Sequence, residues 1–410
     1  MYQRRPIGLR MLLVPALLTT VAYVDPGNFG SNIEAGSTHG YALLWVVVAA
    51  SIAAAIIQYL AALLGLATGG TLASLSAQRM STPMRLLAWA QAEVVVVMTD
   101  LAELIGGALG LYLLFGVPLP AGALVIGVVS VGILLVGRRA ATISAPVTLG
   151  LLAVVAVAVL AVAWTVGARP GAAAGLVPGP LDSLGLVLVT AIVGATVMPH
   201  ALYFHSAVSA DAGLVGGAAR DLAGRFRGPD PRRRLGWAVV AAMGVAGCVN
   251  SALLVLGANL PPGTPSGIEA AHAALAASAG PATGVLLGVA LLASGLASTV
   301  VGVFTGQVVM AGYIHRPVAL WVRRVTAIVP PLVVLLLGID ATTALVVSQA
   351  VLALALPVTL VPLLLLTMSP AVMGSLRPGP IVRVAAVVVT ALITIMDVAL
   401  LSLLFTGRLG

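Results

Sequence analysis

Eleven long apolar stretches follow one another along this chain, and short segments between them carry most of its charge. A stretch of about 20 apolar residues can cross a bilayer, and it does so as a helix because lipid offers no partners for an open backbone. We place the spans at residues 9–39, 41–67, 84–114, 119–137, 144–168, 184–211, 235–258, 281–312, 318–338, 341–366 and 380–405. Since 60% of the residues are hydrophobic and 8% are charged, the sequence predicts an all-α polytopic membrane protein.

The arginines predict how these spans are oriented. All 20 basic residues are Arg, and all but Arg169 and Arg408 fall in or beside loops on one side of the predicted bundle. Cytoplasmic loops carry such an excess, so we expect a bacterial inner (plasma) membrane protein with its N-terminus in the cytoplasm and its C-terminus outside. The net charge of +8 therefore does not indicate a nucleic-acid partner. A single cysteine, Cys248, excludes a disulfide within the chain.

The first span is interrupted by Asp25-Pro26-Gly27-Asn28. Pro26 lacks a backbone donor and Gly27 is conformationally free, so we expect the helix to break there. A broken helix at membrane depth is tolerated only where protein or a water-filled cavity satisfies its backbone, and a carboxylate at that depth indicates a functional site. A surface turn or the end of a signal peptide is the alternative, which the apolar continuation from Phe29 to Gly40 disfavours.

A second break is predicted in the sixth span at Ala195 to His200, where Gly194 and Pro199 interrupt the apolar helix. Interrupted helices at corresponding places in two halves of a chain are typical of transporters that bind their substrate at the membrane midplane. We therefore predict two inverted five-helix repeats, each opening with an unwound helix. The expected organisation is a first repeat at 1–168, an external linker at 169–183, a second repeat at 184–366, and a cytoplasmic loop plus an eleventh span at 367–410.

The residues at the two breaks suggest a cation site. Asp25 and Asn28 supply oxygen ligands, the unwound backbone near Ala22 and Ala195 frees carbonyl groups, and Met198 supplies a thioether. Oxygen ligands alone suit Mg²⁺ or Ca²⁺, whereas added sulfur shifts the preference toward transition metals such as Mn²⁺ and Fe²⁺. The alternative for Met198 is a lipid-facing or packing role.

The third span carries Glu93, Asp100 and Glu103 at spacings of seven and three, which places them on one helical face. Carboxylates inside a membrane need water, partners or protons, so this stripe predicts a proton path. A structural ion-pair network with Arg323 and Arg324 is the alternative, and both can hold together. In the sixth span His205 is interpreted as a packed or hydrogen-bonded residue.

The external loop at 259–280 is expected to contain a short surface helix near Glu269 and His272. These two residues are three positions apart and can share one helical face. A solvated face is the default interpretation, and metal capture is the alternative.

The paired motifs Asp25-Pro26-Gly27-Asn28 and Met198-Pro199-His200 resemble the signatures of the Nramp family of proton-coupled divalent metal transporters. The resemblance extends in order along nearly the whole chain. Further matching stretches are Ile57-Gln58-Tyr59-Leu60, Thr99-Asp100-Leu101-Ala102-Glu103, Gly306-Gln307-Val308-Val309-Met310 and Ser348-Gln349-Ala350-Val351-Leu352. One departure is Ala201, where the family usually has Asn; it removes a side-chain hydrogen bond near the hinge.

The resemblance implies a LeuT-type fold, first seen in a bacterial amino-acid symporter, and a specific set of site residues. The implied metal ligands are Asp25, Asn28, Met198 and the Ala195 carbonyl, joined in some conformations by the Ala22 carbonyl, Gln58 and Gln349. The implied proton path runs past Asp25, His200, Glu103, Asp100 and Glu93, with Arg323 and Arg324 pairing along it.

The sequence thus predicts a proton-coupled importer of Mn²⁺, and also of Fe²⁺, Cd²⁺ or Co²⁺, which works as a monomer without a cofactor. An organic-solute symporter of the same fold is one alternative, but Asp25 would repel a substrate carboxylate. A Mg²⁺-transporting relative is another alternative. A membrane metalloenzyme is a third, and His200 and His205 lack the His-Glu-x-x-His spacing that pairs zinc ligands with a base.

Overall fold

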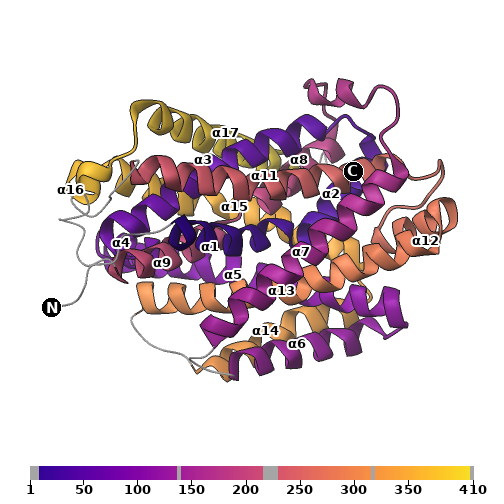
Figure 1. The fold of residues 1–410 in the computed structure, drawn as a ribbon, viewed down its shortest axis with the longest axis horizontal. Coiled ribbons are helices and arrows are strands. Elements are labelled where there is room, and N and C mark those ends of the chain that lie inside the picture. The colour runs from indigo at the N-terminus through magenta and orange to yellow at the C-terminus, as the bar shows by residue number, and fades with distance from the viewer. Residues whose placement is uncertain (1–8, 136–139, 216–229, 315–318, 407–410) are drawn as a thin grey trace.

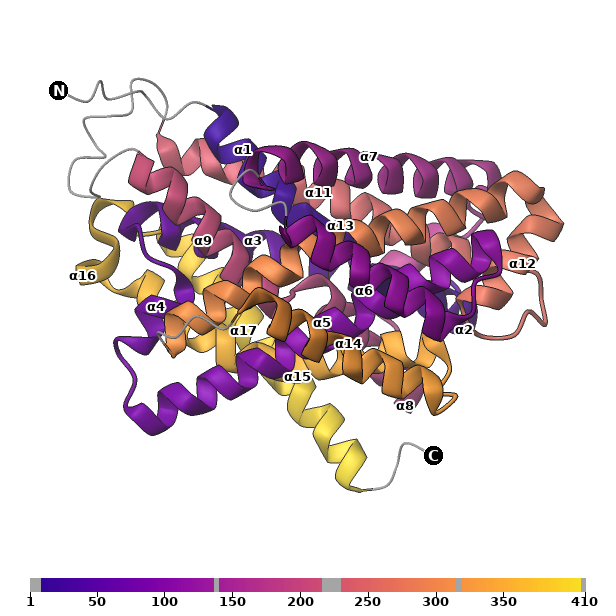
Figure 2. The ribbon, with the colours of Figure 1, turned by 90° about the horizontal axis from the view of Figure 1, so that it is seen from below.

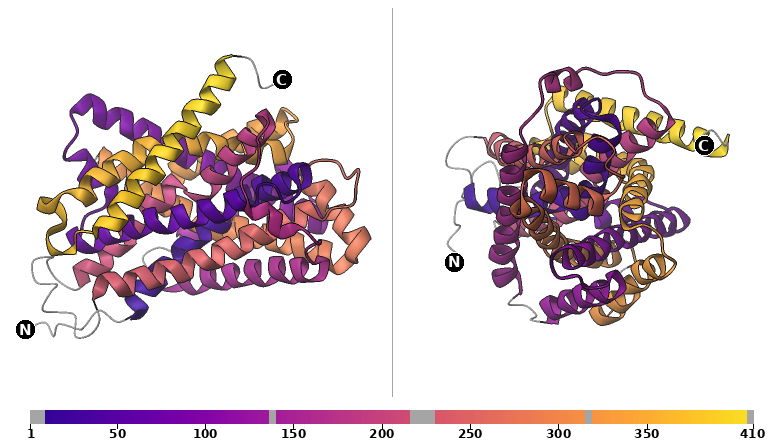
Figure 3. Two further views of the ribbon diagram at one scale, coloured as in Figure 1. Left: turned by 90° about the horizontal axis from the view of Figure 1, so that it is seen from above. Right: turned by 90° about the vertical axis from the view of Figure 1, so that its right-hand side faces the viewer.

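The computed structural model describes residues 9–135, 140–215, 230–314 and 319–406, and throughout these ranges the regular structure is helical. The long helices lie beside one another along the longest axis of the molecule (Figure 1). When the molecule is viewed from one end of the bundle, many helices are seen nearly end-on (Figure 3, right). The predicted all-α architecture is therefore confirmed.

Each predicted span contains a helix, and the first and sixth spans are divided as expected. The helices of the spans are α1 (Leu9–Thr20), η1 (Val21–Val24) and α2 (Pro26–His39), α3 (Leu44–Thr68), α5 (Thr82–Phe115), α6 (Leu119–Leu135), α7 (Ala140–Val166), α8 (Ser183–Thr196) and α9 (Pro199–Val215), α11 (Pro231–Ala258), α13 (Pro281–Tyr313), α14 (Leu320–Leu336), α15 (Ala341–Met368) and α17 (Pro380–Phe405).

Eight segments of the described ranges are long and apolar enough to cross a membrane, with α8 and α9 counted as one. Shorter apolar helices at Leu12–Val24, Leu119–Ser130 and Val325–Leu336 lie in the first, fourth and ninth predicted spans. The count of eleven spans stays a prediction.

Two broken spans form the centre of the bundle. The residues of η1 are buried, as are most of those in α2 and α8. Helices α7, α11 and α13 lie side by side on one flank (Figure 2). On another flank α17 runs along the outside and ends at the C-terminus (Figure 3, left). Unbroken helices thus surround the unwound segments.

Close backbone contacts hold the broken spans against their neighbours. A Cβ atom at Gly36 of α2 would collide with the Leu254 carbonyl of α11, and one at Gly65 of α3 would collide with the Ser206 carbonyl of α9. Small residues allow membrane helices to approach in this way, where packing and not water drives association.

The predicted surface helix in the loop at 259–280 is α12 (Ile268–Ala279), and it is tied to two spans. The Gly267 N–H donates to Glu34 Oε2 of α2 at 3.1 Å, and the Ile268 N–H donates to Thr342 Oγ1 of α15 at 2.9 Å. The loop therefore rests directly on the second half of the first broken span.

The described arginines gather at one end of the bundle, where α4 (Leu72–Ala77) and α16 (Pro370–Met373) also lie (Figure 1). Arg79, Arg85, Arg232 to Arg234, Arg323, Arg377 and Arg383 lie at this end, whereas Arg169 lies in the connection near η3 (Ala172–Leu176) at the other. Residues 216–229 and the arginines at 138, 139, 316 and 408 lie outside the described residues.

Candidate metal site and its polar surroundings

The first break lies at residues 21–25, slightly earlier than the sequence predicts. The α1 helix ends at Thr20, η1 follows, and Asp25 is extended with φ −80° and ψ 170°. Pro26 and Gly27 are the first two residues of α2, so Pro26 starts a helix here and does not interrupt one. The Asp25 side chain caps α2, because its Oδ1 accepts the Asn28 N–H at 2.9 Å.

Asn28 joins the two broken spans. Its side-chain Nδ2 donates to Asp25 Oδ1 and to the Ala195 carbonyl, each at 2.9 Å. The Ala195 carbonyl is available because α8 ends at Thr196, and the last turn of a helix has carbonyls without helical donors. The structure therefore brings together three of the predicted ligand residues from segments that are far apart in sequence.

The second break consists of Val197 and Met198, between the end of α8 and Pro199, which starts α9. Met198 is 0% exposed, so a lipid-facing role for this side chain is excluded. Gly194 lies within α8 and does not interrupt it, which corrects the prediction. A Cβ atom at Gly194 would collide with the Gln349 carbonyl, so this glycine lets α15 approach the break.

Gln349 and Gln58 approach the breaks from α15 and α3. A Cβ atom at Gly27 would collide with the side-chain amide of Gln349, so this amide lies beside the start of α2. Gln58 Nε2 lies 3.5 Å from the carbonyl of Ala201, at the start of α9. Ala22 is buried within η1.

Four oxygen atoms of these side chains are buried and have no hydrogen-bond partner among the described residues. They are Asp25 Oδ2, Asn28 Oδ1, Gln58 Oε1 and Gln349 Oε1. Buried polar atoms are normally paired, so such a set indicates a place built for a ligand. One carboxylate, three amide oxygens, a backbone carbonyl and a nearby thioether suit a divalent cation.

Helix α5 contacts both breaks. A Cβ atom at Gly106 would collide with the Pro26 ring at the first break. At the second break, His200 Nδ1 lies 3.1 Å from Thr99 Oγ1. Residues 99 to 106 of α5 therefore connect the candidate metal site with the carboxylate stripe.

All three stripe carboxylates lie on α5, as the sequence predicts. Glu103 and Asp100 are buried, while Glu93 is partly exposed nearer the arginine-rich end. The Glu103 carboxylate packs on Gly302 of α13, where a Cβ atom would lie 2.8 Å from Oε1. The stripe thus runs from a partly exposed end toward the metal site.

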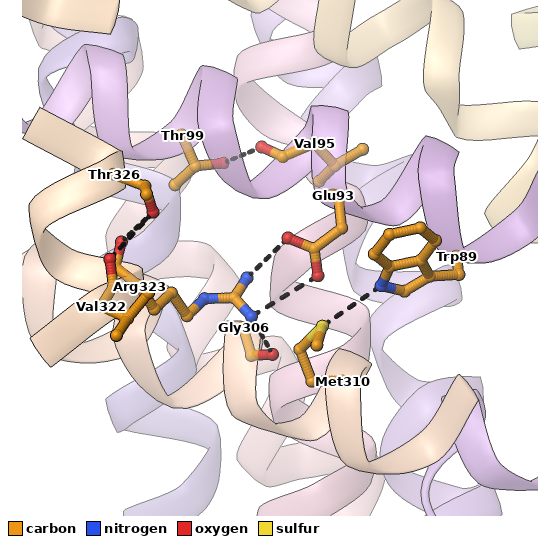
Figure 4. A network of polar contacts seen from close by, with 9 residues as sticks. All are labelled: Trp89, Glu93, Val95, Thr99, Gly306, Met310, Val322, Arg323 and Thr326. Atoms are coloured by element: carbon orange, nitrogen blue, oxygen red, sulfur yellow. Dashed lines mark hydrogen bonds and ion pairs between the residues drawn. The ribbon is translucent and has the colours of Figure 1, made fainter. Parts of the chain in front are cut away.

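Glu93 forms an ion pair with Arg323 of α14 (Figure 4). Arg323 Nη2 donates to Glu93 Oε2 at 3.1 Å, and Nη1 donates to the Gly306 carbonyl at 2.7 Å. The guanidinium lies where a side chain at residue 306 would be, so only Gly306 leaves room for it. The Arg324 side chain lies outside the described part of the structure.

Two other predicted groups lie apart from this arrangement. His205 is buried, and neither ring nitrogen has a hydrogen-bond partner within the described ranges. Glu269 and His272 are half-buried, so each side chain is partly exposed; burial raises the pKa of Glu269 and lowers the pKa of His272. Among the described residues there is no group of three His, Cys, Asp or Glu side chains that could hold a metal ion.

Sequence reasoning missed the donors that hold the unwound backbone of η1. Asn250 Nδ2 of α11 donates to the Tyr23 carbonyl at 3.0 Å, and Ser294 Oγ of α13 donates to the Val24 carbonyl at 2.6 Å. Both residues are polar positions within predominantly apolar spans, which is the signal that could have found them. They satisfy carbonyls that the break leaves without helical partners.

Comparisons with known proteins agree over most of the chain. Residues 16–403 match the model of the natural resistance-associated macrophage protein-like (Nramp) family. The chain is 43% identical over 407 residues to the divalent metal cation transporter MntH of Mycobacterium tuberculosis, covering 97% of this chain and 92% of that one. It is 39% identical over 416 residues to MntH of Deinococcus radiodurans, covering 99% and 92%.

Solved structures agree in fold. A mutant of the Eremococcus coleocola manganese transporter is 29% identical, with a TM-score of 0.79 and coverage of 96% of this chain and 88% of that one. Mhp1, a nucleobase-cation-symport-1 family transporter, is 13% identical with a TM-score of 0.58, covering 100% and 97%. The likeness to Mhp1 concerns the fold alone, which is the LeuT-type fold.

We predict that Ser294→Ala destabilises the protein more than Ser298→Ala does. Both serines are buried on α13 one turn apart, but Ser298 Oγ donates within its own helix, to the Ser294 carbonyl. Loss of Ser294 Oγ leaves the Val24 carbonyl buried and unpaired, which costs about 1–3 kcal/mol. Unfolding in mixed detergent micelles measures both variants, and equal free energies of unfolding would contradict this role.

Proposed function

The chain belongs to the Nramp family, and from this membership and the geometry of the two breaks we propose that it imports divalent transition metal ions. Its relatives are named as metal transporters, so the chain is a transporter and not an enzyme. The observation that carries the proposal is the bridge from Asn28 to Asp25 and Ala195, which places a buried carboxylate between two interrupted helices. We favour Mn²⁺ as the substrate, with Fe²⁺, Cd²⁺ and Co²⁺ also carried.

The metal substrate binds Asp25, Asn28, Met198 and the Ala195 carbonyl in this proposal. Asp25 supplies the negative charge that offsets the cost of removing a divalent ion from water. Gln58, Gln349 and the Ala22 carbonyl join in other conformations, and the closeness of Gln349 to Gly27 supports this. The thioether of Met198 disfavours Ca²⁺ and Mg²⁺, which prefer oxygen ligands alone.

Transport proceeds by alternating access around the broken spans. The two inverted repeats, at residues 1–168 and 184–366, rearrange against each other about this site, while the segment 169–183 links them outside the membrane and the segment 367–410 adds α17. The arginine-rich end faces the cytoplasm of a bacterium, by the positive-inside rule. One chain suffices for transport, because the site is built within a single bundle.

Protons move with the metal along α5. Asp25 and His200 lie at the breaks, Thr99 contacts His200, and the stripe of Glu103, Asp100 and Glu93 continues toward the arginine-rich end. Arg323 pairs with Glu93 there, and Arg324 is assigned to the same path. The Glu93 carboxylate belongs both to this ion pair and to the proton path. It can therefore stabilise the packing of α5 against α14 and also pass a proton.

We expect Asp25→Ala to reduce Mn²⁺ uptake by protein in liposomes to the level of empty liposomes. The substitution removes the carboxylate at the first break, and with it the charge that binds the metal. The control is Asp397→Ala, which removes another buried carboxylate, on α17 outside both repeats, and should leave uptake near wild type. Uptake by Asp25→Ala at more than about half the wild-type rate would reject the site.

Glu103→Gln should weaken the response of Mn²⁺ uptake to external pH while metal binding persists. Glutamine keeps the size and hydrogen bonding of the side chain but cannot titrate. Glu269→Gln on α12 is the control, because it removes a carboxylate outside the path. If the two variants keep the same pH profile as wild type, the stripe serves only as a structural network.

Met198→Ala should make Mn²⁺ uptake sensitive to Ca²⁺ and Mg²⁺. Loss of the thioether leaves an all-oxygen site, and a change of ~1.4 kcal/mol shifts the binding ratio tenfold. We expect weaker Mn²⁺ uptake, a larger loss of Cd²⁺ affinity, and inhibition by Ca²⁺ at about tenfold lower concentration. The control Met243→Ala shortens another buried methionine, on α11; competition curves that coincide for both variants would assign Met198 to packing.

A further inference from the structure

A groove of about 520 Å³ opens on the outside of the bundle, near its arginine-rich end, and the metal path does not include it. It is lined by residues of α3, α11 and the start of α17, and α3 packs against both other helices (Figure 1). Its walls include Ile56, Val240 and Val382, with Tyr59 and Trp237 beside them. Such a wall can hold an acyl chain but offers nothing to a metal ion.

Gly236 is a point on the groove wall that carries no side chain. A Cβ atom there would lie 3.9 Å from Cε2 of Tyr59, so a larger side chain would extend into the space between α3 and α11. Trp237, which is 64% exposed, marks the edge of the groove. Trp and Tyr favour the level of the lipid headgroups, which places this groove at the membrane surface.

Arginines border the polar end of the groove. Arg232 pairs with Asp230, with Nη2 and Oδ2 2.8 Å apart, and its Nη1 donates to the Arg377 carbonyl at 3.4 Å. Arg233 is exposed and has no ion-pair partner among the described residues. Arg377 and Arg383 add two more guanidinium groups on the segment that carries Gly379 and Val382.

This border has an excess of positive charge within the described residues. Asp230 is engaged by Arg232, so Arg233 keeps its charge available at the mouth of an apolar groove. The Nε atoms of Arg377 and Arg383 are buried and have no hydrogen-bond partner in the described ranges. A zwitterionic lipid would fill the apolar part but would leave this charge unbalanced.

We propose that the groove binds an anionic glycerophospholipid from the leaflet at the arginine-rich end. One acyl chain lies along Ile56, Gly236 and Val240, and the phosphate binds Arg233 with Arg232 beside it. Arginine presents a planar fork of donors that matches a phosphate group, and basic pockets between membrane helices select acidic headgroups. The bound lipid would brace α3 against α11, the helices that carry Gln58 and Asn250.

Native mass spectrometry of the full chain tests this proposal. The protein is released from nanodiscs that contain equal amounts of phosphatidylglycerol and phosphatidylcholine, and the lipids that stay bound are counted. We expect wild type to retain phosphatidylglycerol in preference, and Arg233→Gln to lower that preference about fivefold, the effect of one arginine near an anionic surface. Arg79→Gln, an exposed arginine at the same end but away from the groove, should leave the preference unchanged.

A steric variant tests the apolar part of the groove. Gly236→Leu should reduce retention of the lipid whatever its headgroup, whereas Gly244→Leu, on the same helix but with open space around residue 244, should not. Thermal unfolding of each variant identifies any that fail to fold, and Gly236→Ala then replaces Gly236→Leu with a smaller expected loss. Equal retention of the two lipids by wild type, or equal losses in Arg233→Gln and Arg79→Gln, would overturn the proposal.

Discussion

The Asn28 side chain holds the centre of this molecule together. Its amide group donates to the Asp25 carboxylate and to the Ala195 carbonyl, so one residue connects two interrupted helices from opposite halves of the chain. The bond to Ala195 exists only because α8 stops at Thr196 and leaves its last carbonyls free. The same contacts leave Asp25 Oδ2 and Asn28 Oδ1 buried without partners in the described structure, and these are the oxygens that we assign to the metal substrate.

An unwound helix inside a membrane persists only if its neighbours form hydrogen bonds with its exposed backbone groups. Asn250 and Ser294 donate to the carbonyls of Tyr23 and Val24, and Asp25 caps the helix that follows. Close packing also stabilises the unwound segments. At Gly27 and Gly194, atoms of α15 occupy the space that a Cβ would need, and at Gly106 the Pro26 ring of α2 does so. Backbone satisfaction and substrate binding therefore depend on the same few positions, and a change at one is expected to affect the other.

The sequence predicted the helices, both breaks and the stripe on α5, because apolar length and helix-breaking residues are local properties. It predicted the position of the first break less well: Pro26 suits the first turn of α2, and the extended residue is Asp25. It misinterpreted Gly194, whose role depends on α15, and it did not identify Asn250 or Ser294 as donors. Each of these roles depends on which helix lies opposite, and that information is absent from a single span.

The assignment of Met198 as a ligand came from the family resemblance and the chemistry of sulfur; the structure adds that this side chain is buried.

We propose that a transition metal ion binds at the breaks through oxygen atoms and one thioether. X-ray absorption of Cd²⁺ bound to the purified protein measures the first coordination shell directly. The exposed Cys248 must first be replaced by Ser, so that Met198 is the sulfur under test. We predict an oxygen-rich shell with one sulfur atom, and a shell without sulfur after Met198→Ala. A shell of oxygen or nitrogen alone before that substitution, or an unchanged sulfur signal after it, would contradict the account.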